Sequence, residues 1–232
     1  KTCARCWKWR KAMRARLLLL LAALSLIGAP MSVDAKTTGD VKMSCALAQD
    51  AGRLVFTYTV ANEGAQDVYV MDAVPVAEAG RVRLEKGPAY VWLGEDGTAH
   101  LLLGIAPLPE DRDVAGTVIP LAKKLGAGES LKRVLDVPLP LAEFSPYYHR
   151  RGDEAYEPKT VQNVELAVEF LPSAVEGFAA EIPAYAPDYF QVKGKYTLGQ
   201  VRQLSCPHAV ENIRVLKRRD AFPRQQRARP PA

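Results

Sequence analysis

The sequence predicts an all-β protein, built as an antiparallel β-sandwich of about nine short strands. Several segments alternate apolar and polar residues with the period of two that a half-buried strand requires. Turn residues separate these segments, and no stretch of a dozen residues combines a 3.6-residue apolar period with helix caps. Seventeen prolines further disfavour long helices.

A hydrophobic leader precedes the predicted sandwich. Thirteen nearly all apolar residues, Leu17–Ala29, follow Arg14 and Arg16. This run is too short for a membrane-spanning helix, which needs roughly 20 apolar residues. It fits a secretory signal in which the arginines form the positive region and Val33-Asp34-Ala35 supplies a small-residue cleavage site. The leader therefore predicts an exported protein, either periplasmic or secreted.

These signals divide the chain into three expected parts. Residues 1–35 are upstream residues and signal peptide, with Met13 as the initiator and cleavage after Ala35; an uncleaved anchor is the alternative. Residues 36–217 form the sandwich. Residues 218–232 form a disordered basic tail, because three prolines and few apolar residues cannot bury enough surface to offset the entropy of ordering.

Charge is distributed unevenly between the expected domain and its tail. Residues 36–212 carry 17 basic and 24 acidic side chains, a net of −7, whereas residues 213–232 carry seven basic side chains and one acidic, a net of +6. The basic excess of the whole chain therefore does not describe its folded part, and we expect no nucleic-acid partner. The tail suits weak contact with an anionic surface, and a solvated terminus without a function is the alternative.

Two cysteines follow the leader, Cys45 and Cys206. An even number of cysteines in an exported chain predicts a disulfide, and two buried free thiols are the alternative. The two cysteines lie 161 positions apart, near the two ends of the predicted domain. Closing so long a loop stabilises a protein by about 5 kcal/mol in the chain-entropy model.

The clearest strand signals are two alternating segments. In Val164–Phe170, four apolar residues alternate with Glu165, Ala167 and Glu169, which predicts one buried face and one wet face. Leu54–Val60 alternates in the same way and is rich in β-branched and aromatic residues. A turn at Asn62-Glu63-Gly64 and the extended run Val68–Met71 follow it, so this region predicts a strand–turn–strand unit.

Shorter strands are expected between further turn signals. Tyr90–Leu93 and His100–Leu103 flank Gly94-Glu95-Asp96-Gly97 and predict a hairpin, because an Asp-Gly pair tolerates positive φ. The remaining expected strands are residues 81–85, 117–121, 131–137, 189–192, 195–198, 201–206 and 212–216.

Two turn regions resemble those of bacterial immunoglobulin-like domains. One is the Asn62-Glu63-Gly64 turn after a hydrophobic strand, and the other is the Gly-Ala-Gly-Glu-Ser turn at 126–130 before LKRVLDVPLP. The resemblance implies an immunoglobulin-like antiparallel β-sandwich. It is a resemblance of pattern, because the tryptophan and central disulfide typical of antibody domains are not evident.

The sequence carries no recognisable catalytic or cofactor-binding motif. It contains no G-x-S-x-G nucleophile turn, no glycine-rich phosphate loop and no H-x-x-x-H pair. His100, His149 and His208 lie far apart along the chain. We therefore expect no cofactor, no metal and no enzymatic activity.

The candidate binding surface is a segment that combines aromatic and basic side chains, the residue types that dominate protein interfaces. Its residues are Phe144, Tyr147, Tyr148, His149, Arg150 and Arg151. Aromatic side chains that only cover an end of the sandwich are the alternative. A second aromatic segment contains Tyr185, Tyr189 and Phe190, with Pro183 and Pro187 among them.

These observations predict an exported interaction or assembly module of the cell envelope whose partner is an unidentified envelope protein or polymer. One alternative is a hydrolase-type enzyme with a site assembled from separate loops around His149, which predicts a pocket holding a carboxylate and a hydroxyl. A second alternative is a protease inhibitor that presents residues 138–146 as a rigid, protruding segment. A binding module predicts exposed aromatic side chains instead.

Overall fold

The fold is all-β in a computed structural model that describes residues 31–34, 39–50, 52–78, 81–111, 113–114, 116–148, 152, 155–194, 198–220 and 222. The strands are β1 (Met31–Asp34), β2 (Val41–Gln49), β3 (Arg53–Asn62), β4 (Val68–Glu78), β5 (Arg81–Glu85), β6 (Tyr90–Leu93), β7 (Thr98–Leu103), β8 (Leu121–Leu125), β9 (Ser130–Pro138), β10 (Leu141–Ala142), β11 (Tyr156–Pro172), β12 (Phe178–Glu181), β13 (Phe190–Gly194) and β14 (Arg202–Arg218), with a 3-10 helix η3 (Leu198–Gln200). None of the helical residues described here forms a segment able to cross a membrane.

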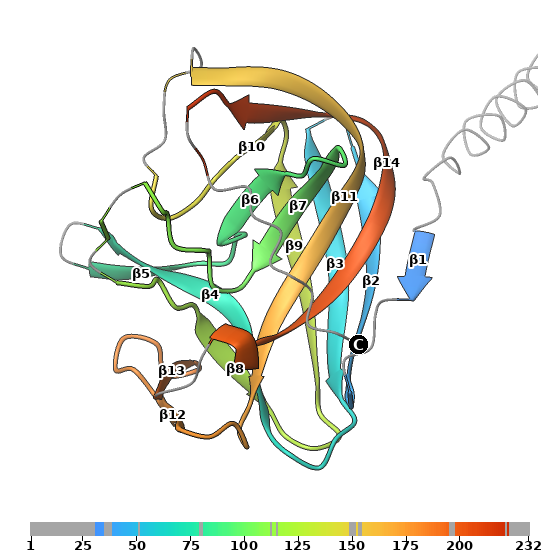
Figure 1. The fold of residues 1–232 in the computed structure, drawn as a ribbon. Helices are drawn as coiled ribbons and strands as arrows, with labels where there is room; N and C mark the ends of the chain where they lie inside the picture. Colours follow the sequence, from blue (N-terminus) through green and yellow to red (C-terminus); the bar gives the residue numbers. More distant parts are fainter. Residues whose placement is uncertain are drawn as a thin grey trace, which may run out of the picture. The chain divides into compact units, whose positions relative to one another are not determined.

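Two sheets pack against each other, which confirms the predicted all-β architecture (Figure 1). The first sheet has the strand order β1-β2-β3-β9, and the second has the order β10-β14-β11-β4-β8-β13-β12. In the second sheet β7 pairs in parallel with β11, and β6 pairs with β7. The two long strands β11 and β14 run side by side as an antiparallel pair across the front of the sandwich.

The prediction of about nine short strands is wrong in number and in length. The described residues contain fourteen strands, and β11 and β14 are 17 residues long each. The expected strands 201–206 and 212–216 are one strand, β14, interrupted by a bulge at which Asn212 has a φ of 50°. The bulge breaks the alternation of residues, so the pattern looked like two strands.

Some elements agree closely with the sequence pattern. The β6–β7 hairpin is present, with Gly97 at a φ of 79° in its turn, and β5 has the expected bounds. Residues 117–120 are not a strand, and β8 starts after them at Leu121. Residues 195–197 lie outside the described residues. The strand β2 was missed, although Val41, Met43 and Cys45 alternate with polar residues in it.

The expected strand–turn–strand unit is present, but its two strands belong to different sheets. The strand β3 lies in the first sheet and β4 in the second, and β9 and β8 are divided in the same way. The β3–β4 connection and the β8–β9 connection are joined by the buried side chain of Asn62. Its Nδ2 donates to the carbonyls of Gln66 at 2.8 Å, Leu125 at 3.1 Å and Gly126 at 3.0 Å. These connections therefore close one end of the sandwich.

The core lies between the sheets and contains the inward residues that alternation predicted. The largest contributions come from β3 (Leu54, Phe56, Tyr58, Val60) and β11 (Val164, Leu166, Val168, Phe170). The expectation of a wet second face on β11 is wrong, since Glu165, Ala167 and Glu169 are buried. A second layer of side chains, including Tyr90, Trp92, Tyr148 and Phe222, covers that face.

The predicted disulfide joins the two sheets. Cys45 on β2 and Cys206 on β14 are both buried, and their Cα atoms lie 6.6 Å apart. The start of the expected tail belongs to the domain, because Arg218 ends β14 with a buried side chain and Phe222 packs on Tyr148. Residues 221 and 223–232 lie outside the described residues, as does the expected leader apart from β1.

Candidate functional site

The first predicted binding segment mainly covers the second sheet. Phe144 exchanges two backbone hydrogen bonds with Val91, at 2.8 and 2.9 Å. The hydroxyl of Tyr147 accepts from the amide of Val118 at 2.8 Å, and the buried Tyr148 hydroxyl donates to Asp111 at 2.6 Å. The described part of this segment therefore fits the covering alternative that the sequence left open. His149, Arg150 and Arg151 lie outside the described residues.

Residues 138–146 are hydrogen-bonded into the sandwich. The amide of Leu139 donates to the carbonyl of Gly52 at 2.9 Å, and that of Glu143 donates to the carbonyl of Leu216 at 3.0 Å. Between them β10 pairs with β14. The segment is therefore anchored to the sandwich at both ends, and the inhibitor alternative stays an untested prediction.

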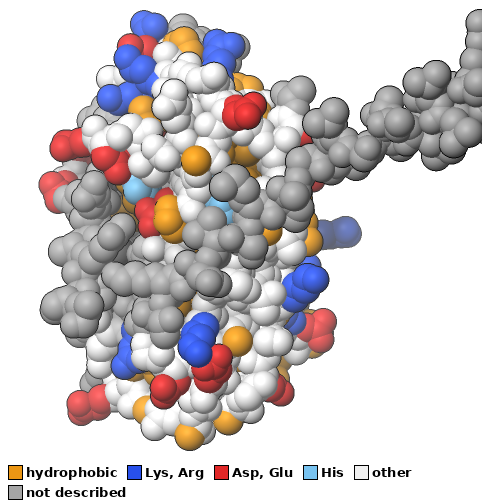
Figure 2. Space-filling model, turned by 90° about the vertical axis from the view of Figure 1, so that its right-hand side faces the viewer, with side chains coloured by type: hydrophobic (Ala, Val, Ile, Leu, Met, Phe, Trp, Pro, Cys, Tyr) orange, Lys and Arg blue, Asp and Glu red, His pale blue; other side chains and the backbone are white. Residues whose placement is uncertain are grey.

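The second aromatic segment has the properties of a presented loop. We call residues 182–189, between β12 and β13, the 182–189 loop. It exposes Ile182 at 58% and Tyr185 at 45%, which are two of the five large hydrophobic side chains exposed among the described residues. On the face of the molecule in Figure 2, the coloured hydrophobic side chains instead lie in small separate groups among charged ones. The 182–189 loop therefore brings two exposed large hydrophobic side chains close together.

Buried residues fix the backbone of the 182–189 loop. Pro183, Ala186 and Tyr189 point inward and are buried. The amide of Ala186 donates to the carbonyl of Pro183, and the amide of Tyr189 donates to that of Ala186, both at 3.0 Å. The ammonium of Lys123 donates to the carbonyl of Asp188 and lies 4.0 Å from the centre of the Tyr189 ring. The exposed side chains therefore stand on a backbone that is already ordered.

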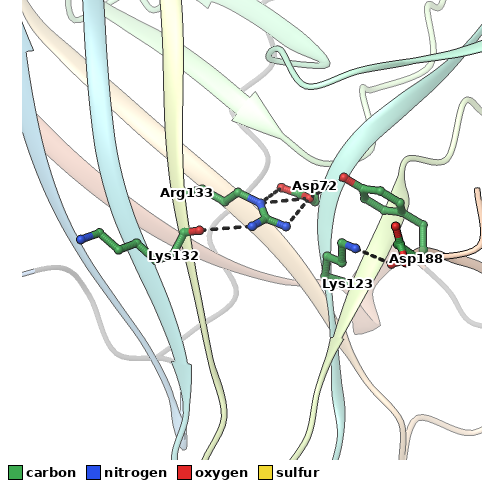
Figure 3. Close-up of polar contacts among 6 residues, drawn as sticks. Asp72, Lys123, Lys132, Arg133 and Asp188 are labelled. Carbon is green, nitrogen blue, oxygen red and sulfur yellow. Dashed lines mark hydrogen bonds and ion pairs between the residues drawn. The ribbon is translucent and has the colours of Figure 1, made fainter.

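An ion pair between the buried Asp72 and the partly exposed Arg133 lies under this loop (Figure 3). The guanidinium of Arg133 donates from Nε to Asp72 Oδ1 and from Nη2 to Asp72 Oδ2, both at 3.0 Å. The Tyr189 hydroxyl donates to the same carboxylate at 3.1 Å. Asp72 belongs to β4, inside the second sheet, and Arg133 to β9, at the edge of the first, so the pair joins the two sheets as well as holding the loop. We call these three residues the Asp72 clamp.

Local backbone geometry explains how these charges reach the interior. The pairing of β4 with β8 shifts register between Met71 and Ala73, so Asp72 is the extra residue of a β-bulge. On β9, Arg133 has the same parity as Leu131 and Leu135, which face the core. An inward charge on an edge strand also discourages pairing with other chains.

The surroundings of the Asp72 clamp favour the protonated form of two tyrosines, Tyr189 within it and Tyr58 beside it. Burial, together with the charge of Asp72 and the hydrogen bond to it, raises the pKa of Tyr189 to about 12. Burial and Asp72 also raise the pKa of Tyr58, which lies behind the pair. The hydrogen bond to Asp72 raises the pKa of Arg133. The Tyr189 hydroxyl and the Arg133 guanidinium are therefore hydrogen-bond donors to the Asp72 carboxylate at neutral pH.

The sequence contained a signal for the clamp that was not used. Asp72 is a single acid inside the apolar run VYVMDAVPV, and Arg133 occupies a core-facing position of LKRVLDV. A charge at such a position is expected to be paired, because an unpaired buried charge is very costly. The identity of the partner could not be read from the sequence, since the two residues lie in different sheets.

A histidine–carboxylate pair lies on the outer face of the second sheet. His100 Nδ1 is 2.9 Å from Glu165 Oε2, and the His100 ring stacks on Trp92 with centroids 4.6 Å apart. These residues are cross-strand neighbours on β6, β7 and β11. A glutamate can orient an imidazole as a base. On the other side of Glu165, however, its cross-strand partner on β14 is Pro207, which has no nucleophilic group. The enzyme alternative around His149 stays an untested prediction.

A third histidine, His208, is buried beside the disulfide. Its Nε2 lies 3.0 Å from Cys45 Sγ and 3.3 Å from Cys206 Sγ, and its ring is 6.0 Å from that of Phe56. Burial lowers the pKa of His208. The imidazole is therefore neutral in the folded protein at neutral pH.

The lowered pKa of His208 predicts a loss of stability in acid. Below an unfolded-state pKa of about 6.5 the unfolded chain binds a proton that the folded protein does not, so stability falls as pH decreases from about 7 to 5. Chemical denaturation across this range measures the slope, and His208→Gln is expected to reduce it. An identical slope in the variant would assign the acid sensitivity to other groups.

Comparison with known proteins adds no relative from which a function could be transferred. No family model matches the chain, and searches of curated proteins and of solved structures found no match to it.

Proposed function

We propose that the protein is an exported, immunoglobulin-like binding module of the cell envelope, and that the 182–189 loop contacts its protein partner. The observation that carries this proposal is the exposure of Ile182 and Tyr185 on a backbone fixed by buried anchors. Aromatic and aliphatic side chains contribute most to binding when little ordering is needed on association. The loop meets both conditions.

Export is supported by two independent features. The leader has the parts of a secretory signal, and the disulfide between Cys45 and Cys206 is compatible with an oxidising compartment. The immunoglobulin-like assignment is supported by two packed sheets whose strands cross between them at two connections. The parallel pairing of β7 with β11 departs from a purely antiparallel sandwich.

Export is tested by expressing the chain from Met13 in a bacterial host and sequencing the N-terminus of the envelope fraction. We expect the mature protein to start at Lys36 and to contain no alkylatable thiol without reductant. A start at Met13 or earlier would contradict cleavage. Cleavage after Ala35 would also remove β1 and leave β2 as the edge of its sheet.

Binding through the 182–189 loop is tested by photo-crosslinking from single positions in the native envelope. A benzophenone amino acid at Tyr185 is expected to give a discrete adduct. The same group at Val82 or Leu108 is the matched control, because these side chains are 44% and 42% exposed against 45% for Tyr185. Equal adducts from all three positions would contradict a specific contact.

The contribution of the loop side chains is tested with the double variant Ile182→Ala/Tyr185→Ala. Loss of two hot-spot side chains is expected to weaken capture of the cross-linked partner at least about thirtyfold, corresponding to about 2 kcal/mol. The melting temperature should change little, since both side chains are exposed. A large fall in melting temperature would instead assign them to the fold.

A further inference from the structure

Three buried side chains, Cys45, Cys206 and His208, form a compact cluster between the sheets. Cys206 and His208 are two residues apart on β14 and point to the same side, and Cys45 reaches them from β2. One potential ligand atom from each residue lies within 4.8 Å of the other two. We propose that, once the disulfide is reduced, this cluster binds a thiophilic d10 cation, Zn²⁺ or Cu⁺.

The donor set suits this class of cation. Thiolate sulfur and imidazole nitrogen are preferred ligands of Zn²⁺ and of Cu⁺. With Zn²⁺, two thiolates balance the charge of the cation and the neutral imidazole adds none, so the loaded cluster has no net charge. A neutral cluster avoids the large cost of an uncompensated charge in an apolar interior. Each of the three side chains is at most 5% exposed.

The cluster needs only local movement to accept the cation. Zinc–sulfur bonds are about 2.3 Å long and zinc–nitrogen bonds about 2.0 Å. The Cα atoms of the two cysteines are already 6.6 Å apart. Rotation of the two side chains after reduction separates the sulfurs, while the strands that carry them stay paired with β3 and β11.

Metal binding and disulfide formation exclude each other, because they use the same two sulfurs. A dithiol reductant supplies two electrons and two protons to the disulfide and itself becomes a disulfide. The cation then displaces the two thiol protons. In the reverse direction, a disulfide oxidant takes two electrons from the two metal-bound thiolates and two protons from water to become two thiols, the Cys45–Cys206 bond forms again, and the cation is released. Formation of the disulfide is therefore coupled to metal release.

The test uses the full chain with Cys3 and Cys6 replaced by Ser, so that after anaerobic reduction with a phosphine Cys45 and Cys206 supply its two thiols. Co²⁺ is the spectroscopic probe of the zinc site, and Zn²⁺ and Cu⁺ are titrated separately against chromophoric chelators. We expect one Co²⁺ per reduced chain, with sulfur-to-cobalt charge-transfer absorption, and no binding to the oxidised chain. The cation that binds more tightly identifies the site as a zinc or a copper site, and either result supports the proposal.

Two variants separate the cluster from generic metal binding. His208→Gln keeps both thiols but is expected to weaken binding at least about tenfold, the loss known even for outer ligand partners. His100→Gln removes another buried histidine and should leave binding unchanged. Equal affinities of wild type and His208→Gln, or of reduced and oxidised protein, would overturn the proposal.

Thermal unfolding controls for binding to an unfolded reduced chain. A cation bound by the folded cluster raises the melting temperature of reduced wild type, because ligands of the native state stabilise it. Reduced His208→Gln should show a much smaller rise. If the cation binds reduced wild type without raising its melting temperature, binding is to unfolded thiols and the proposal is wrong.

Discussion

Replacement of both bridged cysteines, in the variant Cys45→Ala/Cys206→Ala, is expected to lower the free energy of unfolding by about 5 kcal/mol. The bond closes a loop with a sequence separation of 161 residues, and removing it gives the unfolded chain back the corresponding conformational freedom. Loss of two buried sulfurs from the core adds to the effect. Equilibrium denaturation of the oxidised proteins at pH 7 measures the difference.

Reduced wild type whose thiols have not been alkylated is the control for this prediction. It lacks the covalent bond but keeps the volume of both side chains, so the difference between it and the double variant isolates packing from the cross-link. A total loss below about 1 kcal/mol would contradict the prediction. It would mean that the unfolded chain is compact enough for the cross-link to restrict it little.

Asp72→Ala is expected to cause the second largest loss of stability, about 2–3 kcal/mol. Breaking a buried ion pair costs about 3–5 kcal/mol, but the Arg133 side chain is 28% exposed, so solvent screening reduces that figure. The substitution also leaves the Tyr189 hydroxyl without its acceptor. Urea denaturation measures the loss, and amide hydrogen exchange should show faster exchange in the 182–189 loop.

A double-mutant cycle distinguishes a coupled pair from two independent effects. Arg133→Met keeps the length of the side chain and removes its charge, so the variant Asp72→Ala/Arg133→Met buries no unpaired carboxylate or guanidinium. We expect it to be more stable than the sum of the single variants predicts. Strict additivity would mean that Asp72 and Arg133 do not stabilise each other. Tyr189→Phe, which removes one hydrogen bond, should cost about 1 kcal/mol.

Local patterns predicted the individual strands well, and for a physical reason. Alternation in Leu54–Val60 and Val164–Phe170 reports which face of a strand meets the core, and the structure places both sets of apolar residues there. The Asp-Gly turn fixed the β6–β7 hairpin, because only a few residue types adopt its backbone. Such signals are contained within a few residues, so they can be interpreted without knowing the rest of the chain.

These local patterns could not predict which distant segments cover a strand or which sheet a strand joins. Glu165 and Glu169 look like solvent-facing residues, yet segments distant in sequence cover them, and Glu169 accepts a hydrogen bond from the amide of Ile105 at 2.8 Å. The assignment of β3 and β4 to different sheets depends on the same kind of distant contact. For the candidate site, the aromatic segments were visible in the sequence, but only burial separates the exposed Tyr185 from the anchored Tyr189 and Tyr148.

The cross-link near both ends of the domain also determines how the protein responds to a pulling force. Tension applied before Cys45 and after Cys206 first peels the outer parts of β2 and β14 from β3 and β11 and then passes through the sulfur–sulfur bond, so the chain between the two cysteines is not drawn out. On the order of 500 Å of chain is thereby prevented from being drawn out. A module tethered at one end and loaded at the other would therefore lengthen only by its short outer segments until a reductant opens the bond.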